Sequence, residues 1–334
     1  MIRTFQLFAV AATVFATFGA AAILTACEPE KPESRKFRFD YGATLAGLPA
    51  GSKVRVWVPV PQNTTFQRIS WFKPELPAKP EIGTEEEYGN KILYFETQAP
   101  ASGEVKFDLS WQVQRNEVLD HRGAAGDALP IELSKKARER LLQADKMVPV
   151  GGKSLSLIEG VDLPEDPLAL GKLLYERVED HMMYDKSRPG YGSGDAEWAC
   201  DSKFGNCTDF HSLFISLARA KQMPAQFEIG FPLPPERGQG PIGGYHCWAF
   251  FHTDKNGWVP VDISEADKHP DLKKYYFGNL TEDRVTFSSG RDITLVPKQD
   301  GEPLNFFVYP YVEVDGRSLP QEKIQKRFAF EDVE

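Results

Sequence analysis

Cys207 is the residue whose surroundings in the sequence most favour nucleophilic chemistry. The turn-forming pair Gly205-Asn206 precedes it, and apolar residues then recur at helical spacing from Phe210 to Ala218. The pattern predicts that Cys207 lies in the first turn of a mostly buried helix. Unpaired N–H groups and the helix dipole stabilise a thiolate there, and the same amides can bind an oxyanion. The competing interpretation is a small buried cysteine with no chemical role.

A histidine and an aspartate lie on two segments that are predicted to pair as a hairpin. Residues 245–251 and 258–263 read as strands, and Asn256-Gly257 between them is a hairpin signal. If Phe251 and Gly257 close the loop, His246 lies opposite Asp262 on one face of the sheet. A carboxylate that orients an imidazole beside a helix-tip thiol is the arrangement that thiol acyl transfer requires.

Three short blocks around these residues resemble the bacterial transglutaminase-like superfamily. They are Gly205-Asn206-Cys207-Thr208-Asp209-Phe210, Tyr245-His246-Cys247-Trp248-Ala249 and Gly257-Trp258-Val259-Pro260-Val261-Asp262. The resemblance covers roughly residues 165–275, and it departs from the family in one place, where Asn206 replaces the usual aspartate. It implies an α+β, papain-like core in which a thiol-bearing helix packs on an antiparallel sheet. It also implies that Cys207 is the nucleophile, His246 the base and Asp262 the residue that orients the base.

Other residues near the blocks allow alternative roles. His211 lies four residues after Cys207 on the same side of the predicted helix, where it is a second candidate base or a packed histidine. Asp209 in the first turn favours the helix dipole without any catalytic part. A zinc site that combines Cys200, Cys207 and Cys247 with a histidine is a weaker alternative, because the spacings match no short metal-ligand motif.

The remaining cysteines and two tryptophans complete the candidate site. Cys247 alternates away from His246 along its strand, so a disulfide with Cys200 would leave Cys207 as the free thiol. Trp198 and Trp248 are candidates to line the acyl-binding cleft, and the Trp198 N–H could reach an oxyanion. Bulky apolar residues of this kind are, however, more often part of the core.

Alternating and helical patterns divide the chain into segments. Residues 36–118 alternate apolar and polar side chains, for example from Val105 to Val113, which predicts an N-terminal β-sandwich. Residues 119–165 read as a connector with a short helix capped by Ser134. The catalytic domain is expected at 166–275, beginning with a helix at Asp166-Pro167. Residues 276–334 are expected to form a C-terminal β segment that packs on the catalytic core.

The N-terminus predicts export from the cytoplasm. Residues 1–26 have a basic residue, an apolar run and small residues in the order of a secretory signal. The sequence Leu24-Thr25-Ala26-Cys27 resembles the lipobox of bacterial lipoproteins, which implies acylation of Cys27 and anchoring to a membrane of the cell envelope, facing the periplasm. A transmembrane anchor is the alternative. Residues 27–35 would then be a solvated tether.

Composition narrows the class of partner. The net charge is −9, and no cluster of Lys and Arg of the kind that binds nucleic acid is present. No calcium loop is recognisable, so no metal or cofactor is expected. We expect a thioester-forming enzyme that acts on a protein or peptide in the envelope, either at a peptide bond or at a glutamine side chain, and that hydrolyses rather than crosslinks. A non-catalytic envelope binding module on the same fold is the alternative.

Overall fold

The computed structural model describes residues 32–119 and 132–333 of the chain. The signal segment, Cys27 and most of the tether lie outside these residues, as does the middle of the connector, so the predictions for them stand as predictions. Within the described part of the chain, no helix is both long enough and apolar enough to cross a bilayer.

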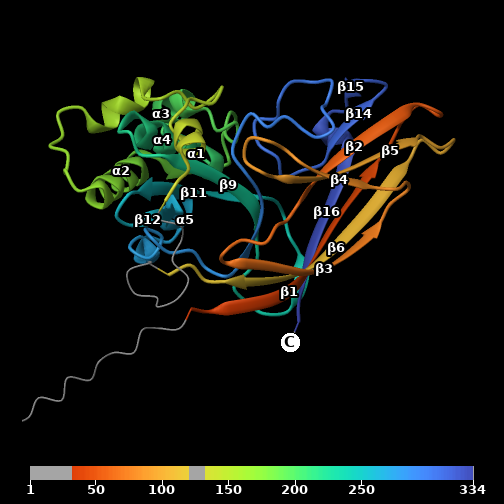
Figure 1. Ribbon diagram of the computed structural model, residues 1–334, viewed down its shortest axis with the longest axis horizontal. Helices are drawn as coiled ribbons and strands as arrows, with labels where there is room; N and C mark the ends of the chain where they lie inside the picture. The colour runs from red at the N-terminus through yellow and green to blue at the C-terminus, as the bar shows by residue number, and fades with distance from the viewer. Residues whose placement is uncertain (1–31, 120–131, 334) are drawn as a thin grey trace, which may run out of the picture.

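Two five-stranded antiparallel sheets form a β-sandwich (Figure 1, right). The first sheet contains, in spatial order, β10 (Gln239–Pro241), β16 (Ile324–Asp332), β1 (Ser34–Leu45), β6 (Val105–Asn116) and β3 (Gln67–Glu75). The second contains β15 (Arg317–Ser318), β14 (Tyr311–Val314), β2 (Lys53–Val60), β5 (Lys91–Gln98) and β4 (Glu81–Thr84). The alternation predicted from Val105 to Val113 is present in β6, where the apolar residues are buried and the intervening residues are more exposed.

The other half of the molecule is a four-stranded antiparallel sheet with helices packed on it (Figure 1, left). The strand order is β12 (Gly257–Val261), β11 (His246–Thr253), β9 (Ala225–Pro232) and β13 (Arg284–Ser289). A short parallel pair, β7 (Met183–Tyr184) and β8 (Phe204–Gly205), packs against the helices. The helices are α1 (Lys135–Leu141), α2 (Pro167–His181), α3 (Ala196–Ser202), α4 (Cys207–Ala220) and α5 (Ile263–Lys268), with three short 3₁₀ helices η1 (Gly152–Ile158), η2 (Pro270–Leu272) and η3 (Gln321–Lys323).

Local sequence signals account for where two of these helices begin. The Ser134 side chain accepts a hydrogen bond from the N–H of Ala137 and caps α1. Asp166 caps α2 in the same way, with proline at the first helical position. Both starts were predicted from the sequence. The mixed α+β class expected from the sequence is confirmed.

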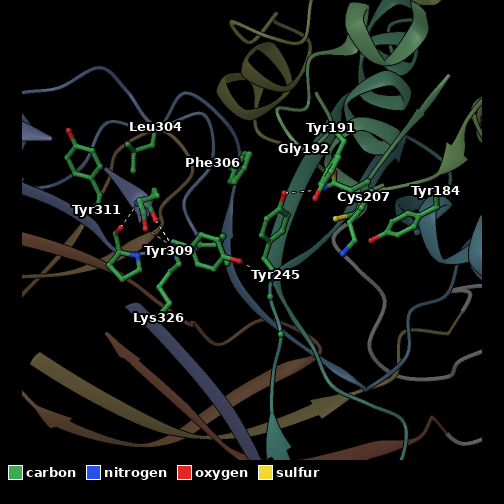
Figure 2. A pocket seen from close by; sticks show the side chains of 17 residues that line it. Tyr184, Tyr191, Gly192, Cys207, Tyr245, Leu304, Phe306, Tyr309, Tyr311 and Lys326 are labelled. Atoms are coloured by element: carbon green, nitrogen blue, oxygen red, sulfur yellow. Dashed lines mark hydrogen bonds between the residues drawn. The ribbon is translucent and has the colours of Figure 1, made fainter. Parts of the chain in front are cut away.

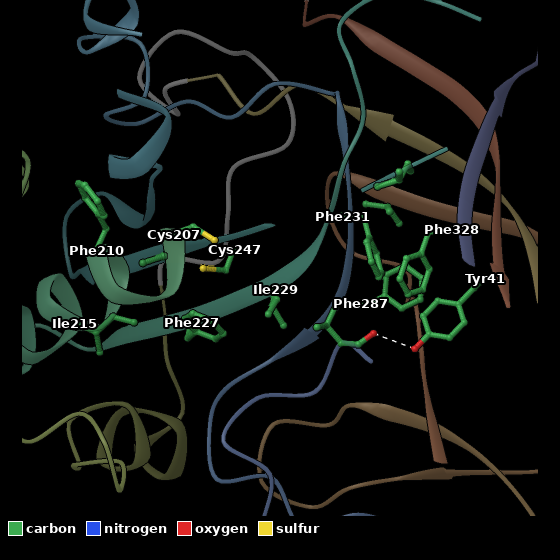
Figure 3. Close-up of a cluster of buried hydrophobic side chains, with 14 of the residues drawn as sticks. Tyr41, Cys207, Phe210, Ile215, Phe227, Ile229, Phe231, Cys247, Phe287 and Phe328 are labelled. Atoms are coloured by element: carbon green, nitrogen blue, oxygen red, sulfur yellow. Dashed lines mark hydrogen bonds between the residues drawn. The ribbon is translucent and has the colours of Figure 1, made fainter. Parts of the chain in front are cut away.

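The two halves share one apolar core rather than meeting through a polar interface. Phe231 of β9 lies 4.4 Å, ring centre to ring centre, from Phe328 of β16, and Phe287 of β13 stacks 5.7 Å from Tyr41 of β1 (Figure 3). The Tyr41 hydroxyl also donates a hydrogen bond to the Val308 carbonyl. Burial of this aromatic cluster fixes the sandwich against the sheet that carries the site.

The C-terminal segment contributes to both halves. Residues 276–334, which we expected to pack on the catalytic core, supply β13 to the four-stranded sheet and β14, β15 and β16 to the two sandwich sheets. Strand β16 pairs with β1 along nine residues, from Leu45 opposite Ile324 to Phe37 opposite Asp332. The sandwich is therefore built from both ends of the described chain.

Candidate active site

Cys207 is the first residue of α4, and a reciprocal pair of side chains fixes this helix start. The Asn206 side chain accepts from the N–H of Thr208 at 2.9 Å, and Asp209 Oδ2 accepts from the N–H of Asn206 at 2.9 Å. Asp209 therefore caps the helix, consistent with its expected structural role, and it also accepts hydrogen bonds from the backbone N–H groups of Gly192 and Gly194. The thiol is held at the dipole's positive end.

His246 begins β11, and Asp262 follows directly after β12 as the N-cap of α5. The His246 Nε2 lies 2.8 Å from Asp262 Oδ2, and the carboxylate is completely buried. The same Oδ2 accepts from Arg284 at 2.9 Å, while Oδ1 accepts from the N–H of Glu265 at 3.2 Å. These donors hold the carboxylate in one orientation, so it orients the ring in turn.

The predicted hairpin register is shifted by two residues. The strands close at Thr253 opposite Gly257, and Val261 lies opposite Ala249 rather than opposite Cys247. The Thr253 hydroxyl accepts from the N–H of Asn256 and donates to its side chain, so β11 continues two residues further than Phe251. A shift of two residues leaves each side chain on its predicted face, and His246 and Asp262 still meet.

Charge in the buried site favours the thiolate and the imidazolium. Burial by itself raises the pKa of Cys207, but hydrogen bonds from Cys247 and His246, together with the His246 charge, bring it well below the ordinary thiol value. Burial likewise lowers the pKa of His246, and the charge and hydrogen bond of Asp262 outweigh it and raise that pKa to about 10. Because Nε2 is bonded to Asp262, Nδ1 is the ring nitrogen left to face Cys207.

Cys247 lies beside the candidate nucleophile, and sequence reasoning missed this. Figure 3 shows its sulfur next to that of Cys207. Burial and the neighbouring Cys207 raise the pKa of Cys247 well above the usual thiol value, so it remains a thiol and donates a hydrogen bond to the Cys207 thiolate. We expected Cys247 to face away from the active site, whereas its side chain meets α4, the helix that carries Cys207.

The predicted disulfide between Cys200 and Cys247 is absent. Cys200, Cys207 and Cys247 are all free thiols. Cys200 lies on α3, where its Sγ is 3.4 Å from the carbonyl oxygen of Lys153, whereas Cys247 Sγ is 3.7 Å from His211 Nδ1. The two cysteines have different neighbours because α3 and β11 pack against different parts of α4, a relation that the sequence does not encode locally.

His211 is completely buried and both of its ring nitrogens are in use. The N–H of Ile263 donates to Nε2 at 3.1 Å, so Nε2 carries no proton, and Nδ1 therefore donates to the Cys207 carbonyl at 2.7 Å. Burial lowers the pKa of His211, in agreement with a neutral ring. His211 ties the start of α4 to the start of α5, and it has no free lone pair with which to act as a base.

Neither tryptophan lines the cleft. Trp248 is fully buried, and its N–H donates to Glu228 at 3.0 Å. The Arg284 guanidinium lies 4.8 Å from the centre of its ring. The ring of Trp198 packs 5.3 Å, centre to centre, from that of Phe204. Both residues belong to the packing around the site, which agrees with the alternative that bulky aromatic residues are more often part of the core, while the oxyanion role of the Trp198 N–H stays a prediction.

A cleft of about 550 Å³ begins at Cys207 and extends to the sandwich (Figure 2). Tyr184, Asn206 and Tyr245 line it near the thiol. Its far part is lined by Phe306, Tyr309, Tyr311 and Lys326, all from the C-terminal segment. Five tyrosines and two lysines line the cleft, and none of its lining residues is acidic. No local sequence pattern predicts this wall, because its residues lie sixty or more positions after the catalytic hairpin begins.

One group in the described residues has the composition of a metal site. His246, Asp262 and Glu265 each place one ligand atom within 4.8 Å of the others. Their charges already have partners, since Arg284 contacts Asp262 and Lys268 contacts Glu265. The group contains no cysteine, and Cys200 lies elsewhere, so the zinc alternative is not supported by this geometry.

Comparison with known proteins agrees with the geometry. Residues 157–263 match the model of the transglutaminase-like superfamily. The chain contains a transglutaminase-like domain. An uncharacterized protein of Haemophilus influenzae is 29% identical over 312 residues, which cover 81% of this chain and 84% of that protein.

The fold of the chain is also found in a solved structure. The crystal structure of a candidate cysteine protease from Cytophaga hutchinsonii superposes with a TM-score of 0.61 at 14% identity, covering 90% of this chain and 92% of the other. The fold class predicted from the sequence, an α+β chain with a papain-like transglutaminase core, is confirmed by this match and by the family domain.

Proposed function

We propose that the transglutaminase-like domain is a thiol acyl-transfer enzyme that hydrolyses amide bonds, with Cys207 as nucleophile, His246 as acid and base, and Asp262 as the residue that orients His246. The observation that carries the proposal is the buried His246–Asp262 contact of 2.8 Å, placed against a thiol at the start of a capped helix. The lowered pKa of Cys207 and the raised pKa of His246 at the end of a cleft support the proposal, because perturbed pKa values cluster at functional sites.

The first half-reaction forms a thioester. The Cys207 thiolate attacks the amide carbonyl carbon, and the electron pair of the C=O bond moves to oxygen. The N–H of Cys207 precedes the first intrahelical hydrogen bond and is positioned to stabilise that oxyanion. Burial raises the pKa of Tyr184, so its hydroxyl, which lines the same end of the cleft, stays protonated and can be a second donor. When the C–N bond breaks, the His246 proton passes to the leaving amine.

The second half-reaction releases the acyl group. Neutral His246, held by Asp262, takes a proton from water, and the hydroxide oxygen attacks the thioester carbonyl. Breaking of the C–S bond regenerates the thiolate, and His246 is protonated again. Water is favoured over a lysine as acceptor because Lys186 and Lys326 line the cleft and no carboxylate there would attract an ammonium group.

Active-site labelling tests the nucleophile and its base. A peptidyl acyloxymethyl ketone should label Cys207 in the wild-type chain, located by peptide mass spectrometry. Labelling should fall at least about a hundredfold in His246→Ala. It should be unchanged in His269→Ala, a matched control whose exposed imidazole lies near Glu265 on the same segment. Equal, slow labelling in all three proteins would instead support a non-catalytic binding module.

The acceptor and the location need separate measurements. Turnover of an amide substrate in ¹⁸O-labelled water, with and without a lysine-containing peptide, should give labelled carboxylate and little amine adduct. A dominant amine adduct would show a crosslinking enzyme. For the location, we infer lipid anchoring in the envelope from residues 1–27 alone. The wild-type chain should fractionate with membranes, and Cys27→Ser should not carry the acyl group.

A further inference from the structure

The wall of the cleft opposite the thiol is contributed by the sandwich, and it carries a lysine that forms no ion pair within the described residues. Lys326 lies on β16 and is partly buried. Its Nζ donates to the carbonyl and the side-chain oxygen of Gln321, at 3.3 and 3.0 Å, and lies 4.7 Å from the centre of the Tyr309 ring. No carboxylate among residues 32–119 and 132–333 lies within ion-pair distance of it.

The ammonium group of Lys326 retains capacity for an anion. It has three N–H donors, and its two hydrogen bonds go to neutral oxygens of one residue. Burial lowers the pKa of Lys326, and the charge of Glu322 opposes this effect. A carboxylate that entered the cleft would find a positive charge that is not already compensated.

The charge of the cleft contrasts with that of the chain. The chain carries 48 acidic and 39 basic residues, yet the residues that line the cleft include Lys186 and Lys326 and no Asp or Glu. Positive potential in a concave, aromatic-lined site of an acidic protein attracts an acidic ligand and disfavours a basic one. The lining thus selects by charge as well as by shape.

A continuous line of contacts connects Lys326 to the thiol (Figure 2). Asn206, next to Cys207, donates to the Tyr245 hydroxyl at 3.1 Å, and the Tyr245 ring lies 5.7 Å from that of Tyr309, which contacts Lys326. Together with the size of the rings, these contacts limit the path to about 15–20 Å. An extended peptide of about five residues covers that length.

We propose that the cleft binds an acidic polypeptide segment, and that Lys326 holds a carboxylate of this segment within about five residues of the amide that Cys207 attacks. The inference rests on the proposed function for the position of the attacked amide. It names Lys326 as a specificity-determining residue and assigns the sandwich a direct part in substrate binding.

Kinetics with matched peptides test the charge preference. Internally quenched alanine-rich peptides carry Glu, Gln or Lys at each of five positions on either side of a central amide, and the full chain is held in detergent. At one or more positions, Glu should exceed Gln in kcat/KM by about fivefold, as expected for a partly buried ion pair. Lys326→Met should remove the difference, Lys326→Arg should keep it, and Lys326→Glu should reverse it in favour of Lys.

A neighbouring lysine provides the control. Lys323→Met changes an exposed lysine of η3 that does not line the cleft, and the preference should be unchanged. Thermal unfolding of each variant separates loss of preference from loss of fold. The proposal is overturned if no position prefers Glu, if the preference survives in Lys326→Met, or if neutral glycan strands compete with the peptides and acidic peptides do not.

Binding measured without catalysis separates this inference from the proposed function. In the Cys207→Ala chain, fluorescence anisotropy with labelled peptides should show the same Glu preference and the same loss with Lys326→Met. Binding preference without turnover in the wild type would refute the enzyme and leave the acidic-segment site intact. Turnover by the wild type without any charge preference would support the enzyme and refute the acidic-segment site.

Discussion

Replacing Asp262 with Asn isolates the contribution of one buried charge to the reactivity of Cys207. The asparagine oxygen can still accept from His246 Nε2, so the ring keeps its orientation while the negative charge is lost. In the native site the pKa of His246 is about 10 instead of the usual 6.5, a difference worth about 5 kcal/mol. Burial opposes this rise, and Asp262 is the first of the groups that produce it.

The expected result follows from the sign of each effect. Without Asp262, burial is opposed by the thiolate alone, so the pKa of His246 falls and the imidazolium is lost at neutral pH. Cys207 then loses its neighbouring cation, and its pKa rises. Because a thiol with the ordinary pKa of about 8.5 is only about one-tenth ionised at pH 7.5, alkylation of Cys207 at that pH should slow by at least about tenfold.

The assay measures the rate at which iodoacetamide alkylates Cys207 at each pH from 4 to 11, and the mass of the intact protein reports the extent of alkylation. The wild-type rate should rise at a pH well below the ordinary thiol value and then stay level through pH 9, whereas Asp262→Asn should rise only near the ordinary thiol pKa. Amide turnover by the wild type should decline above about pH 10, because the leaving amine then receives no proton from His246. Alkylation needs no such proton and should not decline.

Two controls protect this interpretation. Asp262→Asn leaves the buried Arg284 charge without its carboxylate, so the double variant with Arg284→Met checks whether a slower rate reflects altered packing. Asp271→Asn removes an exposed carboxylate from the segment after α5 and should change nothing. Superimposable profiles for wild type and Asp262→Asn would refute the reasoning, as would a wild-type profile that rises only near pH 9.

Three further substitutions have defined outcomes. Cys247→Ala removes a hydrogen bond worth about 1 kcal/mol to the Cys207 thiolate, so the acid limb of the alkylation profile should move up by about half to one pH unit. Gly205→Ala would place a Cβ 2.5 Å from Asp209 Oδ2 and break the helix cap, lowering the free energy of unfolding in urea by about 2–3 kcal/mol. His211→Gln should lower it by about 1–3 kcal/mol, while Cys207 alkylation stays within about threefold of wild type.

Each of these substitutions has a matched control. Cys200→Ala removes a buried free thiol that does not touch Cys207, and its alkylation profile should equal the wild type. Gly243→Ala adds a methyl group where no atom lies within 4 Å, and it should leave unfolding unchanged. The assignment of Cys247 is contradicted if the acid limb of the alkylation profile does not move in Cys247→Ala. The assignment of Gly205 is contradicted if Gly205→Ala unfolds at the same urea concentration as the wild type, and that of His211 if His211→Gln slows Cys207 alkylation a hundredfold.

The sequence predicted the local features of the site and missed the non-local ones. The sequence pattern assigned Cys207, His246 and Asp262 to the correct elements. The signals were the helical spacing after Asn206 and the Asn256-Gly257 turn, and both are local because caps and hairpin turns are encoded by neighbouring residues. The register error arose from the Thr253 side chain, which extends the strand through its contact with Asn256. Such a side-chain bond leaves no trace in a hydrophobic pattern.

The missed residues share a different cause. Arg284 reaches Asp262 from β13, and Lys326 reaches the cleft from β16, so both depend on strand pairings between distant segments. Alternation predicts that a strand exists and which face is buried, but not which edge it joins. The positions of the two tryptophans could not be predicted for a related reason. A bulky aromatic side chain suits a buried core as well as a cleft wall, so the residue type alone does not distinguish the two.

The pairing of β16 with β1 makes completion of the cleft a late event in the life of the polypeptide. The thiol and its histidine are synthesised well before Ile324–Asp332, which close the sandwich and bring in Lys326. A ribosome that stopped short of this strand would release a chain with an open sheet edge at β1, prone to pairing with other chains. Such a fragment would contain the reactive Cys207 sulfur but not the cleft wall that contains Lys326. The cleft can therefore select its substrate only after Ile324–Asp332 has been synthesised and has paired with β1.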